Sequence, residues 1–122
     1  LAIAALKLGA RRVIAIDNDP QALRATLENA RRNEVAGALE VGGPEYPLPV
    51  ADRLVANILA GVLERLAPVL TAAVRPRGQI TLAGLLEDQA AHLQTVYTPA
   101  FKFGPSVSRD GWMRLDGVRE SL

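Results

Sequence analysis

Residues Arg12–Asp17 read Arg-Val-Ile-Ala-Ile-Asp, and the next three are Asn-Asp-Pro; together these residues decide the fold. The apolar run is rich in β-branched residues, which is typical of a strand buried on both faces, as in a parallel sheet. Asp19 is a favoured helix N-cap residue, and Pro20 suits the first helical position. The stretch therefore predicts a buried strand that ends on Asp17 and leads into a helix.

The same alternation of strand and helix continues on both sides of this stretch. Gly9 is a natural stop for a first helix, and three prolines mark residues 44–49 as loop. The apolar periodicity predicts helices over Leu1–Leu8, Pro20–Asn33, Ala60–Val74 and Glu87–Tyr97, and further strands over Leu39–Val41, Leu54–Asn57 and Gln79–Ala83.

The C-terminal part has a different pattern. Phe101–Ser108 and Trp112–Val118 resemble two strands joined by a turn at Arg109–Gly111, which predicts an antiparallel hairpin. Strand–helix alternation followed by a hairpin predicts an α/β fold: a mostly parallel, doubly wound sheet with an antiparallel edge. We expect one domain over residues 1–122.

Composition narrows the functional class. The chain has 122 residues, of which 49% are apolar and 4% aromatic, as suits one aliphatic α/β core. A formal charge of +1 gives no support for a nucleic-acid or anionic-membrane partner. The chain has no cysteine, which excludes thiolate metal sites and cysteine nucleophiles. It has one histidine, which is too few for a histidine metal site. We expect a soluble intracellular domain that contains no metal.

Asp17 is the first candidate binding residue. Ligands of open parallel sheets bind beyond the carboxyl ends of the strands, where a carboxylate accepts the hydroxyl hydrogens of an adenosine ribose. The alternative, at about equal weight, is a solvated strand-end aspartate or a turn former.

Asn57 is the second candidate, because it ends the strand Leu54–Asn57. Its side-chain amide is suited to binding a cofactor or a substrate amine through the carbonyl oxygen. Local chemistry slightly favours another role, as a cap for the helix that begins near Ala60. Gly42–Gly43 presents a similar choice between close backbone approach to an adenine ring and a plain turn.

Other conspicuous residues receive ordinary structural interpretations. We interpret Asp19 as an N-cap and His92 as a solvated residue on a polar helix face. Trp112 is expected to cover the sheet edge or pack on a helix. No Ser-His-Asp set, carboxylate pair or phosphate-loop lysine can be assembled, so the catalytic residues stay unknown.

The order of several motifs resembles the PrmA family, the methyltransferases of ribosomal protein L-eleven. The most specific stretch is Val55–Gly61, Val-Ala-Asn-Ile-Leu-Ala-Gly. The resemblance covers nearly the whole chain through Leu1–Ala10, Ile16–Ala22, Glu28–Asn33, Leu66–Pro68, Gly84–Ala90 and Gly111–Trp112.

The resemblance implies a Rossmann-like class I methyltransferase that uses S-adenosyl-L-methionine in the cytoplasm. The expected acceptors are lysine side chains and the α-amino group of the large-subunit ribosomal protein, with no direct nucleic-acid or membrane partner. Carried onto matching positions, Asp17 would bind the ribose hydroxyls. Asn57 would contact the cofactor near its reacting methyl group and amino-acid end.

Several features depart from the family pattern. The first strand, the glycine-rich loop and the upstream domain that recognises the ribosomal protein are not in the sequence, so we expect a truncated piece that is inactive alone. Asn18 replaces the usual apolar residue that packs on adenine. Arg77 lies where Pro-Gly-Gly is frequent, and we expect it to be harmless.

Three other functions stay open. One is a class I methyltransferase that acts on RNA or a small molecule, although Asn57 is not followed by the prolines that such RNA enzymes often carry. Another is a nicotinamide-dependent dehydrogenase, because Asp17 would suit its ribose equally well. The third is a non-catalytic remnant that acts as a folding or interaction unit.

Overall fold

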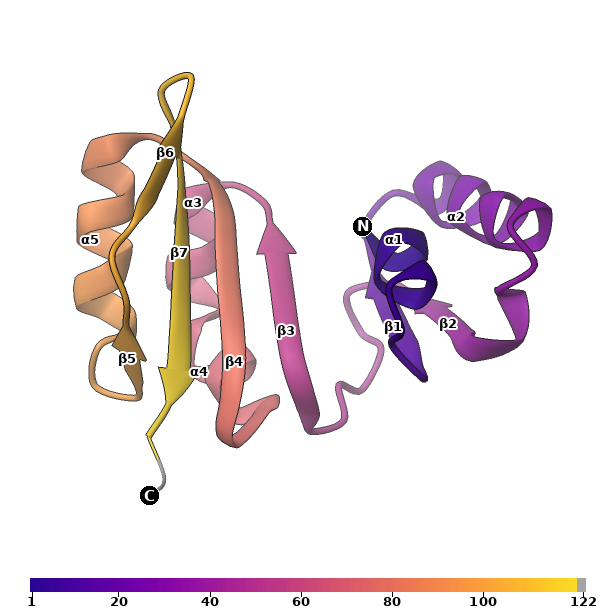
Figure 1. The fold of residues 1–122 in the computed structure, drawn as a ribbon, viewed down its shortest axis with the longest axis horizontal. Coiled ribbons are helices and arrows are strands. Elements are labelled where there is room, and N and C mark those ends of the chain that lie inside the picture. The colour runs from indigo at the N-terminus through magenta and orange to yellow at the C-terminus, as the bar shows by residue number, and fades with distance from the viewer. Residues whose placement is uncertain (121–122) are drawn as a thin grey trace. The chain divides into compact units, whose positions relative to one another are not determined.

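Two parallel strands form the sheet of the first of two compact units in this computed structural model, which describes residues 1–120. This N-terminal unit comprises Leu1–Pro47, and the C-terminal unit begins at Leu48 (Figure 1). The N-terminal unit contains helices α1 (Ala2–Lys7) and α2 (Pro20–Arg32), a 3₁₀ turn (Ala36–Ala38), and strands β1 (Val13–Ile16) and β2 (Leu39–Gly42). These bounds confirm the elements predicted for this part of the chain.

The start of α2 follows from its first residues. The Asp19 carboxylate accepts the backbone N–H of Gln21 at 2.9 Å, and Pro20 follows the cap, as predicted. β1 and β2 pair in parallel, with Val13 opposite Leu39. The buried core of this unit is small and consists of Leu6, Ala30 and Leu39, with partly buried neighbours packed around it.

The C-terminal unit contains a five-stranded mixed sheet. Its strand order is β3-β4-β7-β5, and β6 also pairs with β7. β3 and β4 are parallel, whereas β7 is antiparallel to β4, β5 and β6. The elements are β3 (Ala51–Asn57), α3 (Ala60–Arg65), α4 (Ala67–Ala72), β4 (Val74–Leu85), α5 (Glu87–Tyr97), β5 (Phe101–Phe103), β6 (Val107–Arg109) and β7 (Trp112–Arg119).

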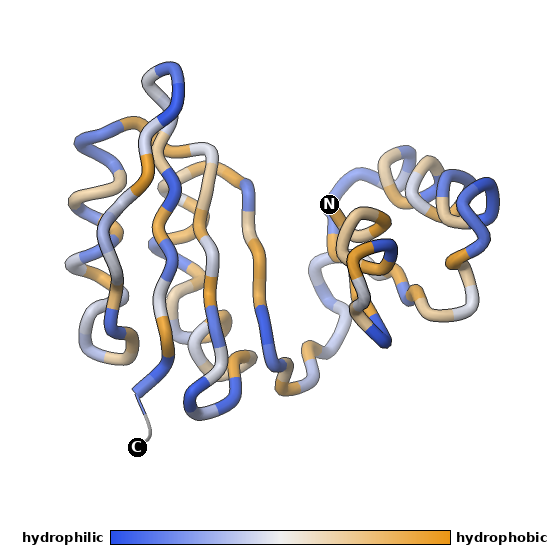
Figure 2. The backbone as a smooth tube through the Cα atoms, viewed as in Figure 1, coloured by the Kyte–Doolittle hydropathy of each residue, from blue (hydrophilic) through white to orange (hydrophobic). Residues whose placement is uncertain are grey.

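The predicted hairpin is confirmed. Asp110 and Gly111 both have positive φ, 52° and 84°, and Arg109 pairs with Trp112 across them. Two positive φ values in a two-residue loop are typical of a type I′ turn, whose twist matches that of the strands. This turn is hydrophilic in Figure 2. The first predicted strand is divided into β5 and β6 by residues 104–106, where Pro105 has no N–H to donate to a ladder.

The single helix predicted over Ala60–Val74 is wrong, because the chain forms α3 and α4 there and Val74 begins β4. Pro68 explains the break: it lacks an N–H, and its ring would collide with the carbonyl of Glu64 in a continuous helix. Near the end of α3, the carbonyl of Leu63 accepts the hydroxyl hydrogen of Tyr97 at 2.6 Å.

The residues predicted as a turn before Gln79 lie inside β4. Arg77 has a φ of 65°, and the pairing of β3 with β4 shifts between Ala51 and Arg53. The strand is therefore longer than predicted, with an irregularity that holds Arg77 in the left-handed region.

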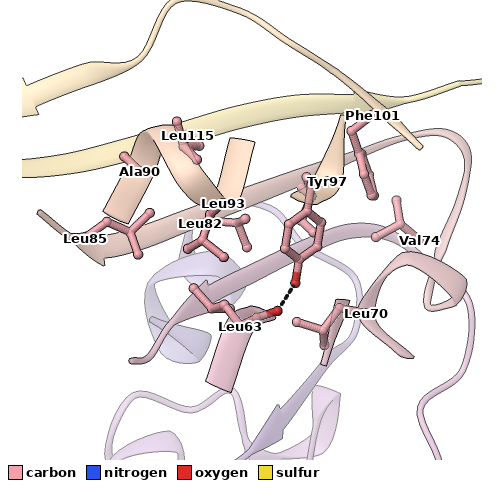
Figure 3. Close-up of a cluster of buried hydrophobic side chains, with 11 residues drawn as sticks. Leu63, Leu70, Val74, Leu82, Leu85, Ala90, Leu93, Tyr97, Phe101 and Leu115 are labelled. Carbon is pink, nitrogen blue, oxygen red and sulfur yellow. Dashed lines mark hydrogen bonds between the residues drawn. The ribbon is translucent and has the colours of Figure 1, made fainter. Parts of the chain in front are cut away.

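Helices α3, α4 and α5 lie on one face of this sheet and enclose its core (Figures 1 and 3). Tyr97 and Phe101 are each 1% exposed, and their ring centroids are 6.1 Å apart. The buried cluster comprises Leu63, Leu70, Val74, Ile80, Leu82, Leu85, Ala90, Leu93, Tyr97, Phe101 and Leu115. Burial of Tyr97 raises its pKa to about 12, because desolvation disfavours the phenolate.

Parallel strands, intervening helices and a C-terminal antiparallel hairpin confirm the predicted α/β class. The chain forms two compact units, and the single domain expected over residues 1–122 stays a prediction. In the part of the chain that the structure describes, no helix has both the length and the apolar character needed to span a bilayer.

Candidate functional site

Asn57 lies at the carboxyl end of β3, opposite Ala83 of β4 in the sheet register. Its side chain is exposed and lines a pocket of about 380 Å³ together with Gly84 and Trp112. Helix α3 has Leu59 as its N-cap and, among the described residues, no side chain that caps it. The carboxamide of Asn57 is therefore not used as the helix cap that local chemistry favoured, and it faces the pocket instead.

Gly84 lies beside that carboxamide for a steric reason. A Cβ atom built on Gly84 would overlap Oδ1 of Asn57, so a side chain at residue 84 would force the Asn57 side chain to move. The φ of Gly84 is 77°, a conformation that glycine adopts at little cost. The absence of a side chain at Gly84 thus leaves the space that the Asn57 carboxamide occupies at the end of the sheet.

The same glycine lies at a β-bulge. The pairing of β4 with β7 shifts between Leu82, opposite Leu115, and Leu85, opposite Met113. A bulge bends a strand and changes the direction of the side chains beside it. This one lies where β7 begins.

Trp112 is the first residue of β7 and immediately follows the hairpin turn. It is 57% exposed and lines the pocket, while its expected role in covering the sheet edge or packing on a helix stays a prediction. Trp112 pairs with Arg109 in the sheet, and Met113, the next residue of β7, lies opposite Leu85 at the bulge. Gly111–Trp112 is one of the segments that resemble the family, but nothing in its residues predicts that Trp112 lines a pocket.

Asp17 directly follows β1 in the N-terminal unit. Its backbone N–H donates to the carbonyl of Gly42 at 3.2 Å, and its Oδ1 accepts the N–H of Asp19 at 3.0 Å. The carboxylate therefore forms a local turn, which is one of the two roles considered for it. The residue is exposed, and a carboxylate has acceptor capacity beyond one bond.

Gly42 and Gly43 end β2 in a turn. The N–H of Tyr46 donates to the carbonyl of Gly43 at 3.0 Å, and a Cβ on Gly42 would overlap the ring of Tyr46. The space beside Gly42 is thus filled by an aromatic ring of the same chain. This arrangement supports the plain turn over the close approach of a ligand at that position.

Glu40 holds Tyr46 in that position. The Tyr46 hydroxyl and the Arg12 guanidinium both donate to the Glu40 carboxylate. The hydrogen bond from Tyr46, followed by that from Arg12, lowers the pKa of Glu40, and the same bond raises the pKa of Tyr46. The three side chains tie the loop after β2 to the strands.

The remaining residues have ordinary roles. His92 is exposed, and its Nε2 lies 3.0 Å from Oε1 of Glu64, which confirms its placement on a polar helix face. Within residues 1–120, no cluster of His, Cys, Asp and Glu side chains is suited to a metal ion.

Comparisons with known proteins identify the family of the chain. The profile of "Ribosomal protein L11 methyltransferase (PrmA)" matches residues 1–120. The chain belongs to this family. It is 49% identical over 122 residues to the ribosomal protein L11 methyltransferase of Tolumonas auensis, covering 98% of this chain and 42% of that protein. It therefore spans about two-fifths of the length of that relative.

Solved structures show the same fold. A ribosomal protein L11 methylase from Lactobacillus delbrueckii subsp. bulgaricus aligns with a TM-score of 0.81 at 29% identity, covering 98% of this chain and 64% of that one. An RNA methyltransferase from Salinibacter ruber, in complex with S-adenosyl-L-homocysteine, aligns with a TM-score of 0.77 at 18% identity, covering 99% of this chain and 74% of that one. The family fold is therefore the Rossmann-like class I methyltransferase fold, as the sequence predicted.

Proposed function

We propose that the protein transfers methyl groups from S-adenosyl-L-methionine to amines of ribosomal protein L11, at lysine side chains and the α-amino group. Membership of the family supports the reaction and the acceptor. The observation that carries the proposal is the Asn57 carboxamide, which lies in a pocket at the carboxyl end of β3 and is not used as a helix cap. This end of the strands is where α/β sheets bind ligands.

Two residues fit the cofactor by their donor and acceptor chemistry. Asp17 is an exposed carboxylate with acceptor capacity left for ribose hydroxyls. The amide of Asn57 has both a donor and an acceptor, which suits the amino-acid end of the cofactor or the acceptor amine. When bound, S-adenosyl-L-methionine supplies an electrophilic methyl group on a sulfonium.

The residues of the chain contribute mainly orientation to such a reaction. A neutral amine must approach the methyl group in line with the bond to sulfur, and holding two reactants in that geometry supplies much of the rate. Asn57 would orient the reacting groups, and the exposed indole of Trp112 would form an apolar wall beside them. The acceptor ammonium must lose its proton before the attack.

Calorimetric titration with S-adenosyl-L-homocysteine tests the proposal, with a nicotinamide dinucleotide as the competing ligand. We expect the chain to bind S-adenosyl-L-homocysteine selectively over the dinucleotide. Asp17→Ala should weaken that binding by at least about tenfold, since hydrogen bonds to a charged group contribute about 1.5–3 kcal/mol. Asp88→Ala, which removes an exposed aspartate of α5, is the control and should leave the affinity unchanged.

Other results would select other functions. Selective binding of the dinucleotide would contradict the proposal in favour of a dehydrogenase. The protein could bind S-adenosyl-L-homocysteine but methylate RNA or a small molecule, and not ribosomal protein L11. That result would support the proposed cofactor and contradict the proposed acceptor. A folded chain that binds neither ligand would contradict cofactor binding by these residues and favour a non-catalytic remnant.

A further inference from the structure

We infer that Gly84 is a positioning residue: it fixes the conformation in which Asn57 presents its carboxamide to the pocket. The inference rests on the proposed function for the identity of the ligand. It rests on the structure alone for the contact between the two residues. Gly84 also lines the pocket, and the effect inferred for it operates through the conformation of Asn57.

The contact is set by the sheet register. Asn57 pairs with Ala83, so Gly84 is one step beyond the pair, at the end of β3. Oδ1 of Asn57 occupies the space that a Cβ on residue 84 would need, and Cγ lies 3.4 Å from the same point. The Asn57 backbone is held by the ladder, so an added Cβ would be relieved mainly by rotation of the Asn57 side chain.

Rotation of that side chain would change the chemistry of the pocket. A side-chain amide has its donor and its acceptor on opposite arms, so rotation redirects both. Because the strand bulges at this point, the register does not place another backbone group of β7 beside Gly84. The Asn57 carboxamide is thus the group that an added Cβ at residue 84 would displace.

The backbone conformation of Gly84 must be separated from this steric effect. Gly84→Ala would add strain at a φ of 77° as well as the overlap with Asn57. Gly111 provides the matched control, because its φ is 84° and no described atom lies within 4 Å of a Cβ built there. Gly111→Ala carries the backbone strain without the overlap.

A double-mutant cycle tests the inference by measuring the affinity for S-adenosyl-L-homocysteine. Gly84→Ala should raise the Kd by about tenfold, within the range of coupling between residues in contact. Gly111→Ala should raise it by less than about twofold. In an Asn57→Ala background, where no carboxamide can be displaced, Gly84→Ala should also change the Kd by less than about twofold.

The emission of Trp112 provides a readout that needs no ligand, because this residue is the sole tryptophan and lines the same pocket. In the ligand-free protein that retains Asn57, Gly84→Ala should shift the emission of Trp112. In the Asn57→Ala background, the same substitution should leave the emission unchanged. Thermal unfolding of each variant shows that it is folded.

These two readouts separate the possible failures. If the unmodified chain does not bind S-adenosyl-L-homocysteine, the proposed function fails, and the emission cycle still decides the role of Gly84. Additive effects of Gly84→Ala and Asn57→Ala on the emission would overturn the inference. So would equal effects of Gly84→Ala and Gly111→Ala on the Kd of a chain that binds.

Discussion

The two compact units differ most in the size of their cores. The C-terminal unit buries a continuous cluster that includes Tyr97, Phe101 and several aliphatic residues of β4. The N-terminal unit buries only Leu6, Ala30 and Leu39, beneath a two-stranded sheet. A small core and a two-stranded sheet provide little stability by themselves.

The candidate binding residues divide between these units in an instructive way. Asn57 lies on the sheet with the large core, and a bulge and a glycine determine its surroundings. Asp17 lies on the small sheet, where its position depends on a local turn and on one bond to Gly42. The backbone of Asn57 is therefore held by the pairing of β3 with β4, whereas a local turn holds the Asp17 carboxylate.

The largest expected effect comes from removing an aromatic residue of the C-terminal core. Phe101→Ala should lower the free energy of unfolding by about 3–5 kcal/mol, through lost burial and the cavity left behind. Urea denaturation followed by circular dichroism measures it. Val55→Ala on β3, where the side chain is 55% exposed, should stay within about 0.5 kcal/mol. Similar losses for the two variants would contradict the assignment of the core.

The buried hydroxyl of Tyr97 should give the next effect. Tyr97→Phe leaves the Leu63 carbonyl without its donor and should cost about 1–2 kcal/mol below pH 10. Because the pKa of Tyr97 is raised to about 12 in the folded state, its protonation stabilises the fold fully below pH 10. That contribution is lost as pH rises from about 10 to 12.

Unfolding measured as a function of pH checks this expectation. The stability difference between wild type and Tyr97→Phe should narrow above pH 10. A difference that is constant up to pH 12 would show that the tyrosine is not desolvated in the native protein.

The irregularity in β4 should give a smaller effect of opposite sign. Arg77 has a φ of 65°, which costs a non-glycine residue about 1–2 kcal/mol. Arg77→Gly removes this strain but adds freedom to the unfolded chain, so a net gain of about 0.5–1 kcal/mol is expected. Lys102→Gly in β5, where φ is not positive, should destabilise; stabilisation by both variants would contradict the role of φ at residue 77.

The smallest effect concerns the N-terminal unit. Tyr46→Phe should raise the pKa of Glu40 toward its ordinary value, since the Tyr46 hydroxyl is the largest cause of its depression. A depressed carboxyl pKa stabilises the fold above the ordinary value of 4.5, and that contribution is lost as pH falls through the folded pKa. NMR titration of the Glu40 carboxyl measures the shift, and an unchanged pKa would contradict the contact.

Local signals in the sequence predicted much of the fold. The Asp19–Pro20 cap, the apolar run of β1 and the Asp110–Gly111 turn each act within a few residues, so they could be read without a structure. The break between α3 and α4 also has a local cause in Pro68, which the apolar periodicity on both sides of it obscured.

The candidate site could be predicted only in part. Asp17 and Asn57 are candidates because each ends an apolar run, a position that the sequence reveals. The contact of Gly84 with Asn57 depends on the register between two strands and on a bulge, which join residues far apart in the chain. The placement of Trp112 in the pocket depends on the same long-range pairing.

The most direct test of the account is an NMR titration of the isotope-labelled chain with S-adenosyl-L-homocysteine. We predict saturable shifts of the Asn57 side-chain amide and of the Asp17 backbone amide. The backbone amide of Leu93 in the buried core should stay in place, and nicotinamide dinucleotide should cause no comparable shifts. A saturating titration that moves neither Asn57 nor Asp17, or a dinucleotide that shifts both equally, would contradict the assignment of these residues to a methyl-donor site.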